Sequence, residues 1–322
     1  MFSLNERVLQ GVVDWLERGE RVWLCTVLET WGSSPRPVGS LLALNDQGSW
    51  LGSVSGGCLE EALLRDLVAS APDDRRVRVL EQGIDDAARE QFRLPCGGRI
   101  RLLIEPLGAE DLEGFQTLLS RLRERQRVTR WCQPAQYRRG VLERVTGPGI
   151  ELDGERILHT LGPQCRLLLV GAGEVARYVA RFARAADFEV ALCEPREAFC
   201  QGWDEPDLPV RQCLPDDLIR AEYADRYAAI LTLAHDPRVD DMALLEALQG
   251  PAFYIGAMGS QKTSALRRQR LHELGLGREA LARLHGPVGF AIGSKTPPEI
   301  AIAILAELVA ERYRLLVRKA PL

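Results

Sequence analysis

The chain has 322 residues, of which 46% are hydrophobic and 27% charged, and its formal net charge is −4. This length can build two domains with proper cores, and the slightly acidic balance argues against a nucleic-acid-binding protein. No apolar run reaches membrane-spanning length, and the N-terminus is charged early, so we expect a cytoplasmic protein with no membrane partner. The eight cysteines form no C-x-x-C pair, which argues against a zinc ribbon.

The first half of the chain predicts an α+β domain. The expected elements are a helix over 4–16, a strand over 21–29, a hairpin over 41–54, a helix over 59–68, strands over 77–80 and 100–105, short and long helices over 85–92 and 109–125, and a strand-like appendage over 128–162. The pair Gly162-Pro163 marks the expected boundary between an N-terminal domain, 1–162, and a C-terminal domain, 163–322.

A loop between residues 30 and 40 carries Arg36 among small residues and prolines. It is either a surface turn with an exposed arginine, or an anion-binding loop in which Ser33, Ser34, Ser40 and Arg36 donate to a phosphate. The sequence leaves both interpretations open.

Ser55, Gly56, Gly57 and Cys58 lie at an expected strand-to-helix turn, where backbone N–H groups are unpaired and can bind an anion. A thiol at a helix N-terminus also has a lowered pKa, so Cys58 is a candidate reactive thiol. A second cysteine, Cys96, precedes two glycines in a similar way. The alternative is that both motifs are plain glycine turns with incidental cysteines.

The second half of the chain predicts a Rossmann-like, doubly wound parallel sheet. A short apolar strand ends at Gly171 and Gly173, a helical run follows, and a second strand ends at Glu194. In this arrangement the glycines allow a phosphate to approach the backbone, and the acid about twenty residues further on holds a ribose hydroxyl. The pattern therefore predicts a dinucleotide-type site with Glu194 favouring NAD.

Three further elements complete this sheet. A strand over 228–233 ends at His235, which either acts on a ligand or caps the next helix together with Asp236. Lys262 begins a helix after a glycine turn and is a candidate phosphate contact, whereas the arginines at 267, 268 and 270 are expected on a solvated face. The last strand is expected over 287–292, before a capped helix.

Several of these motifs occur in one order along nearly the whole chain. They are Gly32-Ser-Ser-Pro-Arg36, Gly52-Ser-Val-Ser-Gly-Gly-Cys58, Pro95-Cys96-Gly-Gly98, Gly171-Ala-Gly173, Glu194-Pro-Arg196, His235-Asp236, Tyr254-Ile-Gly-Ala-Met-Gly-Ser260, His285-Gly-Pro-Val-Gly289 and Thr296-Pro-Pro-Glu299. In this combination the chain resembles the XdhC/CoxI family of accessory factors for molybdenum hydroxylases such as xanthine dehydrogenase. Two positions depart from the family pattern: Glu174 replaces a histidine and Ala291 an aspartate.

The resemblance implies a chaperone that binds molybdenum cofactor (molybdopterin), supports its sulfuration and delivers it to the apo-enzyme. It implies catalytic roles for Cys58 and Cys96, contact of Cys58 with molybdenum, a molybdenum hydroxylase and a cysteine desulfurase as partners, and a homodimer. The competing hypothesis is an NAD(P)-dependent oxidoreductase, which would leave both cysteine turns unexplained. A third is a regulator that only binds a nucleotide.

Overall fold

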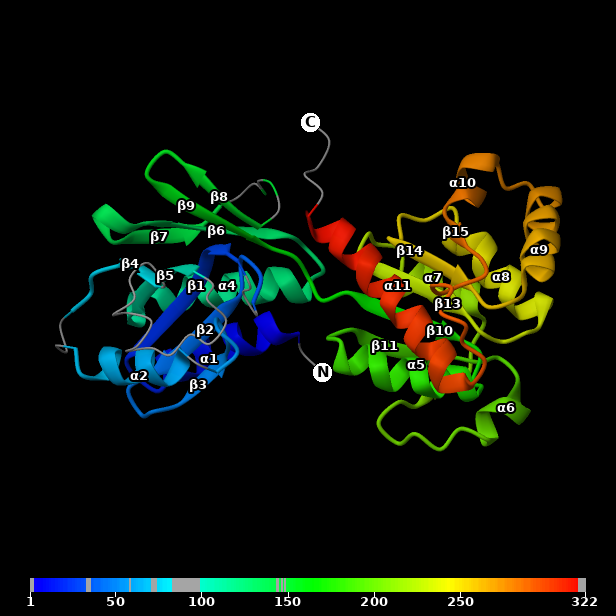
Figure 1. Ribbon diagram of the computed structural model, residues 1–322, viewed down its shortest axis with the longest axis horizontal. Helices are drawn as coiled ribbons and strands as arrows, with labels where there is room; N and C mark the ends of the chain where they lie inside the picture. Colours follow the sequence, from blue (N-terminus) through cyan, green and yellow to red (C-terminus); the bar gives the residue numbers. More distant parts are fainter. Residues whose placement is uncertain are drawn as a thin grey trace. The chain divides into compact units, whose positions relative to one another are not determined.

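The computed structural model describes residues 3–32, 36–57, 59–70, 74–82, 99–142, 145, 147 and 149–317. This part of the chain divides into two compact units, one up to residue 163 and one from 164 to 317 (Figure 1). The fold class is confirmed, with helices and antiparallel sheets in the first unit and a Rossmann-like parallel sheet in the second. Within the described residues, no helix combines the length and apolar character needed to cross a bilayer.

The N-terminal unit is built on a five-stranded antiparallel sheet covered by helices on both faces. The strand order is β3 (Trp50–Gly52), β2 (Leu41–Asn45), β1 (Val22–Trp31), β5 (Arg99–Leu107), β4 (Arg78–Gln82). Side chains alternate along β1, so that Val22 and Leu24 face helices α1 (Leu4–Glu17) and α4 (Leu112–Arg123), while Trp23 and Cys25 face α2 (Glu60–Val68).

A four-stranded antiparallel sheet follows in the same unit, where the sequence predicted only an appendage. Its order is β7 (Arg138–Val141), β6 (Val128–Gln133), β9 (Arg156–Leu161), β8 (Gly149–Asp153), and the 3₁₀ turns η1 (Ala109–Asp111) and η2 (Pro134–Gln136) precede α4 and β7. It packs on the first sheet through a small apolar cluster and through a buried ion pair between Arg130 of β6 and Glu105 of β5.

The C-terminal unit is a six-stranded, all-parallel sheet. Its order is β12 (Val210–Arg211), β11 (Glu189–Cys193), β10 (Arg166–Val170), β13 (Ala228–Thr232), β14 (Tyr254–Ala257), β15 (Leu284–His285), which is the strand order 3-2-1-4-5-6 of a Rossmann fold. Helices α5 (Glu174–Ala185) and α11 (Pro297–Val317) cover one face, and α7 (Pro215–Glu222), α8 (Pro237–Ala247) and α9 (Gln261–Glu273) the other (Figure 1). The short helices are α6 (Glu197–Gln201) and α10 (Arg278–Ala282).

The predicted last strand was wrong, because the sixth strand is Leu284–His285 and residues 287–292 lie outside the sheet. Pro287 has no N–H group for a sheet ladder, and the chain turns there toward α11, where Phe290 donates to the carbonyl of Ala303.

Candidate functional site

The turn that leads into α2 is closed by the carboxylate of Glu60. That carboxylate accepts six hydrogen bonds, from the hydroxyls of Ser53 and Ser55 and from the backbone N–H groups of Val54, Ser55, Gly57 and Leu59. The side chain of Glu60 is almost fully buried. Although burial alone would raise its pKa, these hydrogen bonds outweigh burial and lower the pKa of Glu60 to about 2.

This geometry corrects the expectation that the N–H groups of the turn point outward. They form an anion-binding concavity, as the sequence predicted, but the anion is supplied by the chain itself two residues after Cys58. Gly56 and Gly57 are exposed and have positive φ angles of 80° and 116°, which lets the backbone curl around the carboxylate. A phosphate could use these donors only by displacing Glu60.

Four predicted residues lie outside the described part of the chain: Ser33, Ser34, Cys58 and Cys96. The neighbours of Cys58 are described, and Gly57 and Leu59 both donate to Glu60. In the loop before β2, Arg36 is half-buried and the hydroxyl of Ser40 donates to the carbonyl of Pro37 at 2.7 Å. Ser40 therefore spends its hydroxyl proton within its own loop.

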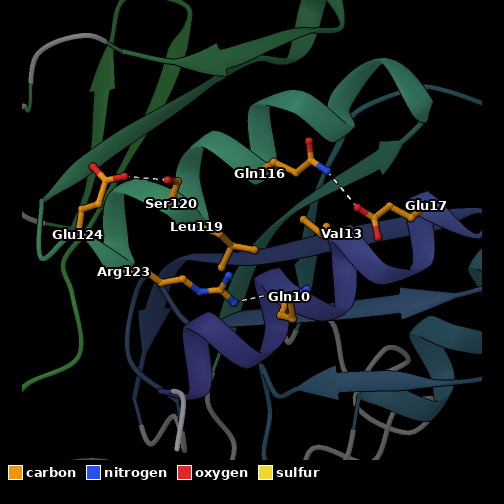
Figure 2. Close-up of a pocket in the computed structure, with 8 residues that line it drawn as sticks. All are labelled: Gln10, Val13, Glu17, Gln116, Leu119, Ser120, Arg123 and Glu124. Atoms are coloured by element: carbon orange, nitrogen blue, oxygen red, sulfur yellow. Dashed lines mark hydrogen bonds between the residues drawn. The ribbon is translucent and has the colours of Figure 1, made fainter.

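A groove of about 520 Å³ runs between α1 and α4 on the outside of the N-terminal unit, and it contains none of the predicted site residues. Figure 2 shows that polar side chains from the two helices meet across it, with Arg123 donating to Gln10 at 2.6 Å and Gln116 donating to Glu17 at 3.0 Å. These pairs hold the two helices together, and their charges are already partnered within the groove.

In the C-terminal unit, the carboxyl ends of the strands bring most of the predicted Rossmann residues to one edge of the sheet. Gly171 ends β10 with a φ of 109°, and a Cβ atom there would lie 2.5 Å from the backbone of Ala234, at the end of β13. A Cβ atom on Gly173 would meet nothing within 4 Å. The two glycines thus have different tasks: Gly171 lets two loops approach, and Gly173 leaves open space at the start of α5.

We expect Gly171→Ala and Gly173→Ala to separate stability from binding. Gly171→Ala should destabilise the unit by about 1–3 kcal/mol because a backbone must move, whereas Gly173→Ala should leave stability nearly unchanged. Gly173→Ala should instead weaken a phosphate-bearing ligand by on the order of tenfold, because its methyl group fills the approach to the backbone. Thermal unfolding and calorimetric titration with NADP measure both effects. Unchanged affinity in folded Gly173→Ala protein would count against a dinucleotide-type site.

Glu194, the expected ribose ligand, is fully buried and engaged inside the chain. Its carboxylate accepts from the N–H of Ala172 at 3.2 Å, from the N–H of Arg196 at 3.0 Å, and from the Arg196 guanidinium twice at 2.8 Å. Burial alone would raise the pKa of Glu194, but the hydrogen bonds from Arg196 outweigh burial and hold that pKa below its ordinary value. These four bonds use the acceptor positions of the carboxylate.

His235 and Asp236 follow β13 at the same edge. The Asp236 side chain caps α8 by accepting from the N–H of Arg238 at 3.0 Å, so the capping role that the sequence allowed belongs to Asp236. His235 is exposed and has a φ of 55°, a conformation that is uncommon for a residue with a side chain. Its imidazole is therefore presented at the mouth of the crevice.

The prediction of a solvated arginine face on α9 was wrong. Arg267 is buried and donates to Asp240 at 3.2 Å and to the carbonyl of Met258 at 3.1 Å, while Asp240 accepts from the N–H of Ala234 at 3.1 Å. Arg268 and Arg270 also have partners, in the backbone before Pro287 and in Asp241. The buried pair fixes the loops after β13 and β14, and Lys262, one turn earlier on α9, is exposed.

We expect Arg267→Leu to lower the free energy of unfolding by about 3 kcal/mol at pH 8, because Asp240 is left buried without its cation. Burial already raises the pKa of Asp240 to about 6, so the folded state binds a proton more readily than the unfolded state. The cost of the buried charge is therefore present above pH 6 and disappears as the pH falls toward about 4.

Denaturation of Arg267→Leu at pH 8 and pH 5 measures this effect, and the loss relative to wild type should shrink at the lower pH. Arg270→Leu is the matched control on the same helix, because the partly exposed Arg270–Asp241 pair should be worth less than about 1 kcal/mol. An equal loss at both pH values would contradict the role of the Asp240 charge.

A second polar cluster, not anticipated from the sequence, lies on the other face of the sheet. Glu307 of α11 accepts from the Tyr254 hydroxyl and the Gly289 N–H, both at 2.7 Å, and lies 2.9 Å from Nδ1 of His285. The cluster ties α11 to β14 and β15. The signal was present in the motifs around 254 and 285, but the acid on α11 is far away in sequence.

Metal-ligating side chains do not gather within the described residues, where no group of three or more His, Cys, Asp or Glu residues could hold an ion. Cys25, Cys165 and Cys193 are buried as expected for core thiols, and burial raises the pKa of Cys25 and Cys193 far above the ordinary value.

Two family models match the sequence. The model described as the XdhC Rossmann domain matches residues 167–308, and the model of the XdhC and CoxI family matches residues 15–81. The two matches follow the order of the two structural units.

Similar proteins cover nearly the whole chain. The molybdenum cofactor insertion chaperone PaoD of Escherichia coli is 28% identical over 96% of this chain and 89% of its own length. A probable xanthine dehydrogenase subunit from Bacillus subtilis is 24% identical over 94% and 96%. A crystal structure from Bacillus halodurans, described as a xanthine dehydrogenase, is 22% identical, covers 100% of this chain and 98% of its own, and has a TM-score of 0.75, which shows a shared fold.

Proposed function

We propose, from the premise that this chain belongs to the XdhC and CoxI family, that it is an accessory factor that binds molybdenum cofactor and hands it to a molybdenum hydroxylase of the xanthine dehydrogenase type. The similarity to a named molybdenum cofactor insertion chaperone over 96% of the chain supports this proposal. The observation that carries it is the turn around Glu60, because a backbone held by six hydrogen bonds frames position 58 on both sides.

The cargo suits a division of tasks between the two units. Molybdopterin carries a phosphate and a soft dithiolene–molybdenum centre, and a cysteine thiolate is a suitable ligand or sulfur carrier for such a centre. We assign that role to Cys58, with Cys96 as a second thiol. The turn donates its N–H groups to Glu60, so we assign phosphate recognition to the Rossmann edge, with Gly171, Gly173, His235 and Lys262 around it.

The proposal includes steps that involve partners. A cysteine desulfurase would supply the sulfur atom for sulfuration, a molybdenum hydroxylase such as xanthine dehydrogenase would receive the cofactor, and the chain would act as a homodimer in the cytoplasm. An enzyme that turns over substrate is not required for these tasks. The competing function, an NAD(P)-dependent oxidoreductase, has the same Rossmann edge but gives the buried turn at Glu60 no role.

Mass spectrometry of the ligand released from protein purified from a host that makes molybdenum cofactor tests the proposal. A pterin bound in a ratio near one per chain is the expected result. A nicotinamide dinucleotide in its place, with no pterin, would support the oxidoreductase instead. A wild-type chain expressed in a host that cannot make molybdopterin is the matched control, and its ligand fraction should contain no pterin.

A further inference from the structure

The side chain of Arg196 joins the ends of three neighbouring strands. It is held by Glu194 after β11, which also binds the N–H of Ala172 after β10, and its Nη2 lies 3.4 Å from the carbonyl of Ala234 after β13. The ends of β10 and β13 border the switch point of this sheet, where ligands of open α/β folds bind. Arg196 thus lies at the crevice, in front of the acid that the sequence assigned to a ribose.

The guanidinium is fixed on one side and available on the other. Nε and Nη2 donate to Glu194, whereas Nη1 has no hydrogen-bond partner among the described residues, and the nearest carboxylate, that of Asp236, is 3.8 Å away. Asp236 is itself bound more closely by Arg238, at 2.8 Å. The guanidinium also lies 3.9 Å from the ring centroid of Phe199, so that its plane is supported from one face.

We propose that Arg196 is the phosphate-recognising residue of this crevice and selects a ligand with a phosphate monoester, while Glu194 is the positioning residue that aims it. A buried carboxylate with all four acceptor positions occupied cannot receive a ribose hydroxyl. A guanidinium with a free pair of N–H groups instead favours a doubly charged phosphate over a neutral hydroxyl. This inference does not rest on the proposed function, because it concerns only the Rossmann unit.

The acidic groups that face this position limit the strength of the effect. Asp236 is paired with Arg238, and Glu174 at the start of α5 is exposed and lies 3.4 Å from Arg177, so neither is an isolated charge. A phosphate near Arg196 would also meet the open backbone at Gly173. We therefore expect a preference on the order of tenfold rather than an absolute requirement.

Calorimetric titration of the full chain with NADP and NAD tests the inference, because these probes differ only in a 2′-phosphate. NADP should bind on the order of tenfold more tightly, and Arg196→Ala should remove the difference while Arg196→Lys keeps part of it. Arg238→Ala, which removes an exposed cation next to the crevice, should leave the preference unchanged. Equal or tighter binding of NAD, no binding of NADP at about 1 mM, or a preference that survives Arg196→Ala would overturn the inference.

Two further measurements identify the source of the phosphate and the role of Glu194. If the monoester itself is recognised, inorganic phosphate should compete with NADP in wild type and lose that ability in Arg196→Ala. Glu194→Gln should reduce the NADP preference without changing the affinity for NAD, whereas a purely structural role would reduce both equally. A chain that carries a pterin but shows no NADP preference would keep the proposed function and lose this inference.

Discussion

Cys58→Ser should leave the fold intact and abolish activation of a partner molybdenum hydroxylase. The change is nearly isosteric, and serine is itself favoured at the start of a helix. A serine hydroxyl, however, neither carries a sulfane sulfur nor offers molybdenum a soft ligand. The measurement is the activity of the co-expressed partner, compared between wild-type chain and variant, with circular dichroism to confirm that the variant folds.

Cys96→Ser should act in the same direction, and Cys165→Ser is the control, because Cys165 is buried in the core of the other unit. Iodoacetamide should modify Cys58 faster than Cys165 or Cys193 near neutral pH, since those two thiols are buried. The difference should come from access rather than from a lowered pKa, because Leu59 N–H donates to the Glu60 carboxylate. Full activation by Cys58→Ser protein would leave Cys58 as a cap residue and remove the thiol mechanism.

The fold was accessible from the sequence because its signals are local. A buried strand, a glycine turn and an amphipathic helix repeat through the second half, and Gly171 with Gly173 fixes where the sheet begins. The second sheet of the N-terminal unit was underestimated, because its four short strands pair through contacts between residues distant in the sequence, such as Arg130 with His159. The predicted strand at 287–292 failed because hydrophobicity alone does not reveal where Pro287 breaks the ladder.

The site was less accessible, because a sequence does not say which group satisfies an exposed N–H or a buried acid. The glycine turn before α2 predicts an anion, and only the structure shows that Glu60 provides it. Glu194 has the position of a ribose ligand in sequence, yet Arg196, two residues later, occupies its oxygens. In the sequence Arg267 is one charge on a polar helix, and its partner Asp240 is 27 residues away.

Glu60→Ala should lower the free energy of unfolding of the N-terminal unit by about 3 kcal/mol or more at neutral pH. The physical reason is that six donors lose their acceptor while several of them remain buried. The pKa of Glu60, about 2 against an ordinary value of 4.5, corresponds to roughly 3 kcal/mol at about 1.4 kcal/mol per unit. Denaturation followed by tryptophan fluorescence reports on this unit, because five of the six tryptophans lie in it.

The dependence on pH distinguishes this carboxylate from a side chain that merely fills space. Because the folded-state pKa of Glu60 is depressed, its contribution is complete above pH 4.5 and is lost as the pH falls toward 2, so the curves of wild type and Glu60→Ala should converge there. Glu60→Gln should be nearly as unstable as Glu60→Ala, because its amide would turn a donor toward N–H groups. Glu61→Ala, at the exposed neighbouring acid, should change stability by less than about 1 kcal/mol. A loss for Glu60→Ala no larger than that control, or one that stays constant down to pH 2, would mean that the turn does not depend on its internal anion.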